Sequence, residues 1–387
     1  MADAYIVEAL RTAGGRARKG GLVDVHPAEL GATVLNALVA RTGIDPAAVE
    51  DVIVGCVTQG GEQAFAFGRN LVLASSLPDS VPAVTIDRQC GSSQQALHFA
   101  AQAVMSGTQD IVIAAGAESM TRVPMNSNWQ FHRQAGVGTG PWSPAIQKRY
   151  GVAEFSQFHG AQAIADKYGL TREAMDEFAL ASHVKAAAAI DSGAFRDEIV
   201  PVTTPNGVFD TDDGVRRGGT KEAISEVKTL EEGGTITAAN ASQMTDGASG
   251  AMIVSEAALR RFNLLPLARI VNLTVTAGDP VIMLEEPIPA TRKALARAGM
   301  RLDDIDLFEV NEAFASVPMA WLKALGADPA KLNVHGGAIA LGHPLGASGT
   351  KLMATLVHAL KARNGRYGLQ TMCEGGGIAN VTIVERL

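Results

Sequence analysis

The chain has 387 residues, of which 47% are hydrophobic and 41 are glycine, so we expect a tightly packed α/β enzyme with two or three domains or one large fused core. Its formal net charge of −7 argues against a nucleic acid partner, and no apolar run approaches the roughly 18–20 residues of a membrane span. Three cysteines are too few for a disulfide framework, and no signal or transit peptide is expected before the first strand, so we expect a cytoplasmic protein in a reducing compartment.

The first third of the chain alternates between strand-like and helix-like segments. Short β-branched runs predict buried strands, and the apolar spacing between them predicts amphipathic helices. The expected strands are 4–9, 52–54, 83–86 and 111–114, and the expected helices are 27–41, 62–76 and 93–106.

The middle of the chain has a different character. Residues 120–156 are rich in Pro, Gly, Trp, Asn and Gln without periodicity, which predicts a long excursion that covers a site. Residues 171–190 predict one helix with Thr171 as its cap, and 202–219 predict a polar loop. We therefore expect an inserted loop domain at 118–244.

The last third repeats the rhythm of the first and predicts a duplicated α/β unit. One core half would be 1–117 plus about 245–265, and the other would be 266–387. The expected strands are 268–275, 307–310 and 369–372, and the expected helices are 291–298, 313–325 and 349–361.

Cys90 lies between a predicted strand and a predicted helix. A thiol at this junction would face the unpaired N–H groups of the first helical turn, which favour thiolate, the nucleophilic form. The sequence therefore predicts a lowered pKa for Cys90. A small buried core cysteine is the alternative, and it is the simplest interpretation for Cys56.

Three further segments carry reactive side chains at predicted strand ends. Asn311 follows a strand and precedes a helix, and a glycine-rich loop at 333–344 presents His335 and His343. Cys373 ends a strand just before three glycines, where the backbone can approach a substrate closely.

Other chemistry is less well supported by these residues. The sequence has no Cys-x-x-Cys or His-x-x-x-His pairing, so we expect no metal site. A disulfide between Cys90 and Cys373 is compatible with the sequence but disfavoured by the expected compartment.

Four motifs together resemble the signature blocks of the thiolases. These are DRQCGS at 87–92, NEAFA at 311–315, GHPxGxSG at 342–349 and CxGGG at 373–377, in the family's order and spacing. The resemblance covers essentially the whole chain. It implies an α/β fold with a duplicated mixed-sheet core, layered α-β-α-β-α, and an inserted loop domain. It also implies an acyltransferase that cleaves 3-ketoacyl-CoA with CoA or runs the reverse condensation.

The resemblance also implies a role for each reactive residue. Cys90 would take up the acyl group, and His343 would accept its proton and help bind the enolate oxygen. Asn311 would hold a water that completes this first oxyanion site. Cys373 would be the acid/base, and the N–H groups of Cys90 and Gly375 would form the second oxyanion hole.

Binding of CoA is implied at further positions, with CoA and acyl-CoA as substrates and no permanently bound cofactor. Ser242 would lie against the pantetheine, with Ala313 and Phe314 alongside it. Arg216 would lie near the nucleotide, and Arg217 and Lys221 would add positive potential in an acidic chain, although a solvated loop is the alternative.

The acyl pocket departs from the family pattern. Many members have Met-Gly-x-Gly-Pro where this chain has Met283-Leu284-Glu285-Glu286-Pro287, and His159 falls where relatives often carry Met. We therefore assign the acyl pocket to His159 and Met283, and we assign no length to the acyl chain that it accepts.

Several functions remain open. A degradative 3-ketoacyl-CoA thiolase is favoured, with a biosynthetic acetoacetyl-CoA thiolase as the alternative. A non-catalytic acyl-CoA binding protein is more distant because no catalytic position is lost. Cys373 argues against a ketoacyl synthase or a cysteine hydrolase. The family implies a homodimer or homotetramer.

Overall fold

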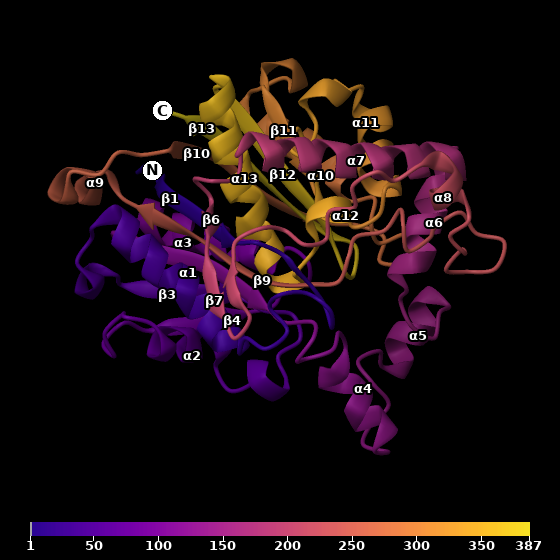
Figure 1. Cartoon of the computed structure of the whole chain (residues 1–387), viewed down its shortest axis with the longest axis horizontal. Helices are drawn as coiled ribbons and strands as arrows, with labels where there is room; N and C mark the ends of the chain where they lie inside the picture. Colours follow the sequence, from indigo (N-terminus) through magenta and orange to yellow (C-terminus); the bar gives the residue numbers. More distant parts are fainter. Residues whose placement is uncertain (1) are drawn as a thin grey trace.

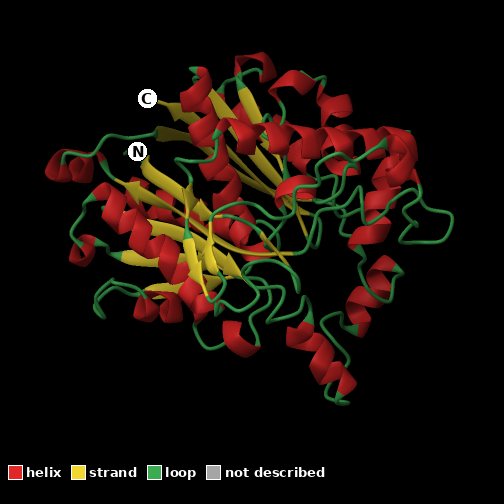
Figure 2. Cartoon of the chain, in the orientation of Figure 1, coloured by secondary structure: helices red, strands yellow, loops and turns green. Residues whose placement is uncertain are grey.

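A computed structural model describes residues 2–387, and one large mixed sheet runs through it (Figures 1 and 2). The order of its main strands is β11-β12-β13-β10-β1-β9-β5-β3-β4, with β2 paired to β9 and β6 paired to β1. Their bounds are β1 (Tyr5–Thr12), β2 (Gly15–Arg16), β3 (Asp51–Gly55), β4 (Ala83–Ile86), β5 (Ile111–Glu118), β6 (Ile199–Val200), β9 (Thr245–Val254), β10 (Ala268–Ala277), β11 (Leu307–Val310), β12 (Tyr367–Glu374) and β13 (Ile378–Arg386).

The sheet consists of two halves with the same strand order. In the first half β3 is parallel to β4 and β5, while β9 is antiparallel to β5 and β1. In the second half β11 is parallel to β12, while β13 is antiparallel to β12 and β10. The counterpart of β4 is reduced to a parallel bridge between Phe308 and Leu332. This repetition supports the expected duplication, and the domain boundaries themselves stay a prediction.

Helices form three layers around the two half-sheets. Helices α3 (Ser92–Ser106) and α13 (Ser348–Arg363) pack together between the halves, where Leu97 and Met353 share one core with residues of both. Helices α1 (Pro27–Thr42) and α2 (Phe67–Ala74) cover the outside of the first half, and α10 (Pro287–Ala298) and α11 (Ser316–Leu325) cover the second. The α-β-α-β-α layering is confirmed.

The central helices approach closely because small residues face each other. A Cβ atom added at Gly349 would lie 2.0 Å from the backbone nitrogen of Gln94, so only glycine fits. This contact fixes the start of α13 against the start of α3. The residues that precede the two helices, including Cys90 and His343, are thereby held near one another.

Most predicted elements are confirmed, with informative differences. The segment expected as helix 62–76 forms α helix only from Phe67, because Phe65 and Ala66 adopt left-handed φ values of 53° and 51°. Strands β9 and β13 were not predicted as strands. Every residue of β9 is buried, so it lacks the alternation that marks a half-exposed strand.

The inserted segment contains more regular structure than its composition predicts. Residues 120–156 include α4 (Ser127–Gln134) and α5 (Pro144–Tyr150), which project from the lower right of Figure 1. Helix α7 (Arg172–Ser192) begins as predicted, with the Thr171 hydroxyl accepting from the Ala174 N–H. The inserted segment also contains α6 (Gln157–Lys167), β7 (Val202–Thr204), β8 (Gly207–Phe209) and α8 (Lys221–Ser225). Two further helices, α9 (Glu256–Phe262) and α12 (Ala338–Leu341), lie outside it.

Within residues 2–387, no helix is long and apolar enough to cross a membrane.

Candidate active site

One of the four reactive side chains comes from the first half and three come from the second, with Cys90 and His343 at equivalent places before α3 and α13. Cys90 lies between β4 and α3, and His343 lies shortly before α13. Asn311 directly follows β11, and Cys373 is the penultimate residue of β12. Because β11 and β12 are parallel, their carboxyl ends meet at one edge of the sheet.

His343 is held as a neutral base with a defined tautomer. The Ser348 hydroxyl donates to the Pro344 carbonyl at 2.8 Å, so its oxygen can only accept from His343 Nδ1, 2.5 Å away. Nδ1 therefore carries the proton, and Nε2 is unprotonated. Burial, and then the charge of Lys351, lower the pKa of His343 to about 3. An unprotonated Nε2 is what a base for Cys90 requires.

Asn311 completes this arrangement from the neighbouring strand. Its Nδ2 lies 3.3 Å from Nε2 of His343, and both side chains are almost fully buried. With Nε2 unprotonated, the amide N–H is the donor. The two residues predicted for the first oxyanion site therefore lie side by side, and the water expected on Asn311 stays a prediction.

Cys90 is partly accessible, and its pKa is raised to about 12, so the predicted lowering is wrong. Desolvation is the main cause, followed by the charge of Glu374. Helix α3 begins only at Ser92, with Gly91 as its cap, so Cys90 lies outside the first turn. Two N–H groups, its own and that of Gly375, do donate toward the sulfur and oppose the rise. These are the two donors predicted for the second oxyanion hole.

Cys373 is fully buried and close enough to Cys90 for their charges to interact. Burial raises its pKa well above the usual value, and the charges of Cys90 and Glu374 add to the rise. Both thiols are therefore protonated at rest. Cys56 is a buried core residue that contacts Gln63, and all three cysteines are free.

The residues predicted for the pantetheine lie together. The Ser242 N–H donates to the Ala313 carbonyl at 2.9 Å, and Ala241 bridges to Phe314. Phe314 also stacks edge-to-face with Phe158, whose ring is partly exposed. Backbone pairing of Met244 with His343 connects this strip to the base.

Arg216 lies at a separate pocket of about 150 Å³ under α7 and α8. Its backbone N–H donates to His183 Nδ1 at 3.1 Å, which fixes the loop, while its guanidinium has no carboxylate partner among residues 2–387. Arg217 and Lys221 are paired with Asp191 and Glu177. The pocket is lined by Leu180, His183, Arg216, Gly219, Thr220, Ala223, Ile224, Val227 and Ala239.

The two residues assigned to the acyl pocket differ in exposure. Met283 is 6% exposed and has a left-handed φ of 60°, and His159 is exposed on α6. Leu284 is buried in the core, and Glu285 bonds to Lys167, the last residue of α6, and to Tyr168, which follows it. Glu285, at the variable position of the motif, therefore anchors this loop to the inserted segment.

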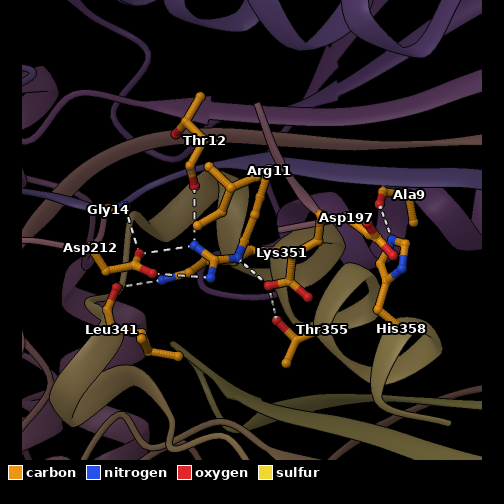
Figure 3. A network of polar contacts seen from close by, with 12 residues as sticks. Ala9, Arg11, Thr12, Gly14, Asp197, Asp212, Leu341, Lys351, Thr355 and His358 are labelled. Carbon is orange, nitrogen blue, oxygen red and sulfur yellow. Dashed lines mark hydrogen bonds and ion pairs between the residues drawn. The ribbon is translucent and has the colours of Figure 1, made fainter. Parts of the chain in front are cut away.

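The sequence did not reveal a buried charged network behind the His343 loop (Figure 3). Arg11 is fully buried and bonds to Asp212 at 2.9 and 3.0 Å and to Glu198 at 2.5 Å. Lys351 donates to the carbonyls of Leu341 and Gly342, the two residues before His343, at 2.6 and 2.8 Å. Two features of the sequence could have revealed this network. They are the arginine within the apolar strand β1 and the lysine within the apolar helix α13.

His335 lies away from the reacting groups, against Phe195. In the described part of the chain, no group of three His, Cys, Asp or Glu side chains is arranged to hold a metal ion.

Comparison with known proteins identifies two matching family models. The thiolase N-terminal domain matches residues 4–257, and the thiolase C-terminal domain matches residues 264–386. The steroid 3-ketoacyl-CoA thiolase FadA6 of Mycobacterium tuberculosis is 52% identical over all of this chain and 95% of its own length. A 3-ketoacyl-CoA thiolase of Bacillus subtilis and an acetyl-CoA acetyltransferase of Cupriavidus necator are each 40% identical over the full length of both chains.

Proposed function

The chain belongs to the thiolase family, and we propose that it cleaves 3-ketoacyl-CoA with CoA through an acyl group carried on Cys90. It is an acyltransferase of CoA thioesters, and its relatives support the degradative direction. The observation that carries the residue assignment is the unprotonated Nε2 of His343, a tautomer set by Ser348 and matched by the Asn311 N–H that donates to it.

The first half of the reaction forms the acyl enzyme. Nε2 of His343 takes the proton of Cys90 as the sulfur attacks the 3-keto carbon. The N–H groups of Cys90 and Gly375 stabilise the resulting oxyanion. The bond between C2 and C3 then breaks, and the thiol of Cys373 protonates the departing acetyl-CoA enolate, whose oxygen is held by His343 and a water on Asn311.

The second half returns the enzyme to its starting state. The Cys373 thiolate removes the proton of free CoA, and the CoA sulfur attacks the acyl group on Cys90. The Cys90 sulfur leaves and recovers its proton from His343. No metal, oxidant or reductant is needed to balance either half.

CoA is proposed to extend from the reacting thiols along Ser242, Ala313 and Phe314 to the pocket at Arg216. This path is supported by the backbone pairing of the 241–244 strip with both Phe314 and His343. The guanidinium of Arg216 would lie near the nucleotide end of CoA, whose negative charge favours a nearby cation.

Thiolysis of purified protein with a graded series of 3-ketoacyl-CoA substrates tests the proposal. The series runs from acetoacetyl-CoA through long straight chains to ring-bearing acyl groups. CoA-dependent cleavage that strengthens beyond the four-carbon substrate is expected, and Cys90→Ala is expected to abolish it. Binding of CoA esters without cleavage of any of them would refute the enzymatic function.

Ring-bearing acyl groups are the proposed substrate class, with His159 and Met283 facing the acyl chain. The support for this substrate class is the 52% identity to a protein named as a steroid 3-ketoacyl-CoA thiolase. We expect kcat/KM to be higher for a ring-bearing than for a straight-chain substrate of equal carbon number. We also expect His159→Met to change that ratio, and an unchanged ratio would contradict the assignment.

A biosynthetic acetoacetyl-CoA thiolase is the second candidate, because a relative named acetyl-CoA acetyltransferase is also 40% identical. Cleavage of acetoacetyl-CoA alone in the same series would favour it. A homodimer or homotetramer and a cytoplasmic location stay predictions. The exposed Val84 on edge strand β4 and the exposed Phe65 support self-association near the Cys90 segment.

A further inference from the structure

A small cavity lies next to Asn311 and to Ser348, the two residues that hydrogen-bond to His343. It offers about 10 Å³, close to the space that one water molecule requires. Its lining includes Glu309 and Asn311 of the β11 segment and Ser348, Lys351 and Thr355 of α13. A cavity with this many polar groups is suited to an ordered water.

Two buried oxygens at this cavity have no hydrogen-bond partner in the described protein. They are Oε2 of Glu309 and Oδ1 of Asn311. The two residues are two positions apart, so their side chains leave the strand on the same face. An unpaired buried oxygen is costly, and a water between these two oxygens would give each of them a hydrogen-bond partner.

The orientation of the Asn311 amide depends on the same oxygen. Nδ2 must face Nε2 of His343, since turning the amide over would place Oδ1 against the lone pair of Nε2. The amide keeps the productive orientation only if Oδ1 is satisfied on its other side. The cavity is the place where this can occur.

We propose that Glu309 is a positioning residue, which, as a neutral carboxylic acid, holds the Asn311 amide in its productive orientation through one internal water. The acid O–H donates to the water, and the water donates to Asn311 Oδ1. The amide N–H is then directed at Nε2, which reinforces the Nδ1–H tautomer that Ser348 sets. This inference rests on the proposed function for its catalytic meaning.

The surroundings of Glu309 favour its neutral form. Burial raises its pKa well above the usual value, and the charges of Glu312 and Glu198 add to the rise. Lys185 of α7 and Lys351 of α13 oppose it. Lys351, however, directs its ammonium to the carbonyls of Leu341 and Gly342, as Figure 3 shows for Leu341.

Infrared spectroscopy on the full chain tests the protonation state without using turnover. The spectrum of wild type minus Glu309→Gln, at neutral pH, should contain the C=O band of a protonated carboxylic acid. Glu256→Gln removes an exposed carboxylate and is the matched control, which should give no such band. Absence of the band in the Glu309→Gln difference would overturn the proposal.

Two variants of similar size test the positioning. Glu309→Gln keeps a donor for the water, whereas Glu309→Leu removes it. We expect kcat within about twofold of wild type for Gln and a loss of about tenfold for Leu, with an unchanged KM for CoA.

The nitrogen resonances of ¹⁵N-labelled His343 should show the Nδ1–H tautomer in wild type and Glu309→Gln and a mixture in Glu309→Leu. Equal histidine spectra for the Gln and Leu variants would overturn the positioning role. Because the infrared and nitrogen spectra need no substrate, they remain decisive even if no 3-ketoacyl-CoA is cleaved. Failure of the proposed function is therefore distinguishable from failure of this inference.

Discussion

Replacing Arg11 with methionine should destabilise the protein strongly, because its guanidinium is the buried link between the core and the inserted segment. It bonds to both oxygens of Asp212 and to one oxygen of Glu198, and the side chains of all three are at most 1% exposed (Figure 3). The ring of Phe195 also lies 4.7 Å from the guanidinium carbon. Methionine fills part of the volume and leaves two buried carboxylates without a cation.

The expected loss is about 3–5 kcal/mol in the free energy of unfolding, the range for removing one partner of a buried ion pair. Arg11→Lys should lose less, since a cation remains but the paired bonds to Asp212 do not. Arg260→Met is the matched control, because Arg260 and its partner Glu256 are 77% and 61% exposed. An exposed pair of this kind contributes little, so the control should be nearly as stable as wild type.

Urea titrations followed by tryptophan fluorescence would measure these differences. A loss below about 1 kcal/mol for Arg11→Met would refute the reasoning.

Three further predictions concern the reacting groups and CoA. Cys373→Ser should lower turnover by about 10³-fold or more while mass spectrometry still detects an acyl group on Cys90, and unchanged turnover would exclude a two-cysteine mechanism. Since the pKa of Cys90 is raised to about 12, its rate of alkylation by iodoacetamide should keep rising from pH 7 to pH 10, whereas a plateau near pH 7 would mean a resting thiolate. Arg216→Gln should raise the KM for CoA about tenfold, and the neighbouring Arg217→Gln, which removes an arginine paired with Asp191, should change it less than twofold. Equal effects of the two arginines would contradict the assigned nucleotide pocket.

Features that depend on neighbouring residues in the chain were predictable from the sequence. The strands and helices around Cys90 and Cys373 follow from local apolar patterns, and the Thr171 cap follows from its own side chain. The junction positions of the reactive residues were predicted for the same reason. The family motifs then identified their chemistry.

Features that depend on distant segments were not predictable. The pKa of Cys90 is set by burial and by Glu374, which is far away in the sequence. The left-handed residues Phe65 and Ala66 interrupt a segment whose composition favours a helix. The cavity at Glu309 exists only because α13 is packed against the β11 segment. Each of these requires the folded chain.

The raised pKa values of both thiols are compatible with catalysis because the reaction never requires two negative sulfurs at once. In the resting protein the proximity of Cys90 and Cys373 makes a second thiolate costly. In the proposed reaction the Cys373 thiolate forms only after the Cys90 sulfur has become an acyl thioester. His343, whose pKa is about 3, holds a proton poorly until an anionic sulfur or oxyanion forms beside it. Proton transfer and nucleophilic attack must therefore be closely coupled. That coupling requires Nε2 of His343 to be unprotonated at the moment of attack, so the proposed reaction depends on the Ser348 hydrogen bond that sets this tautomer.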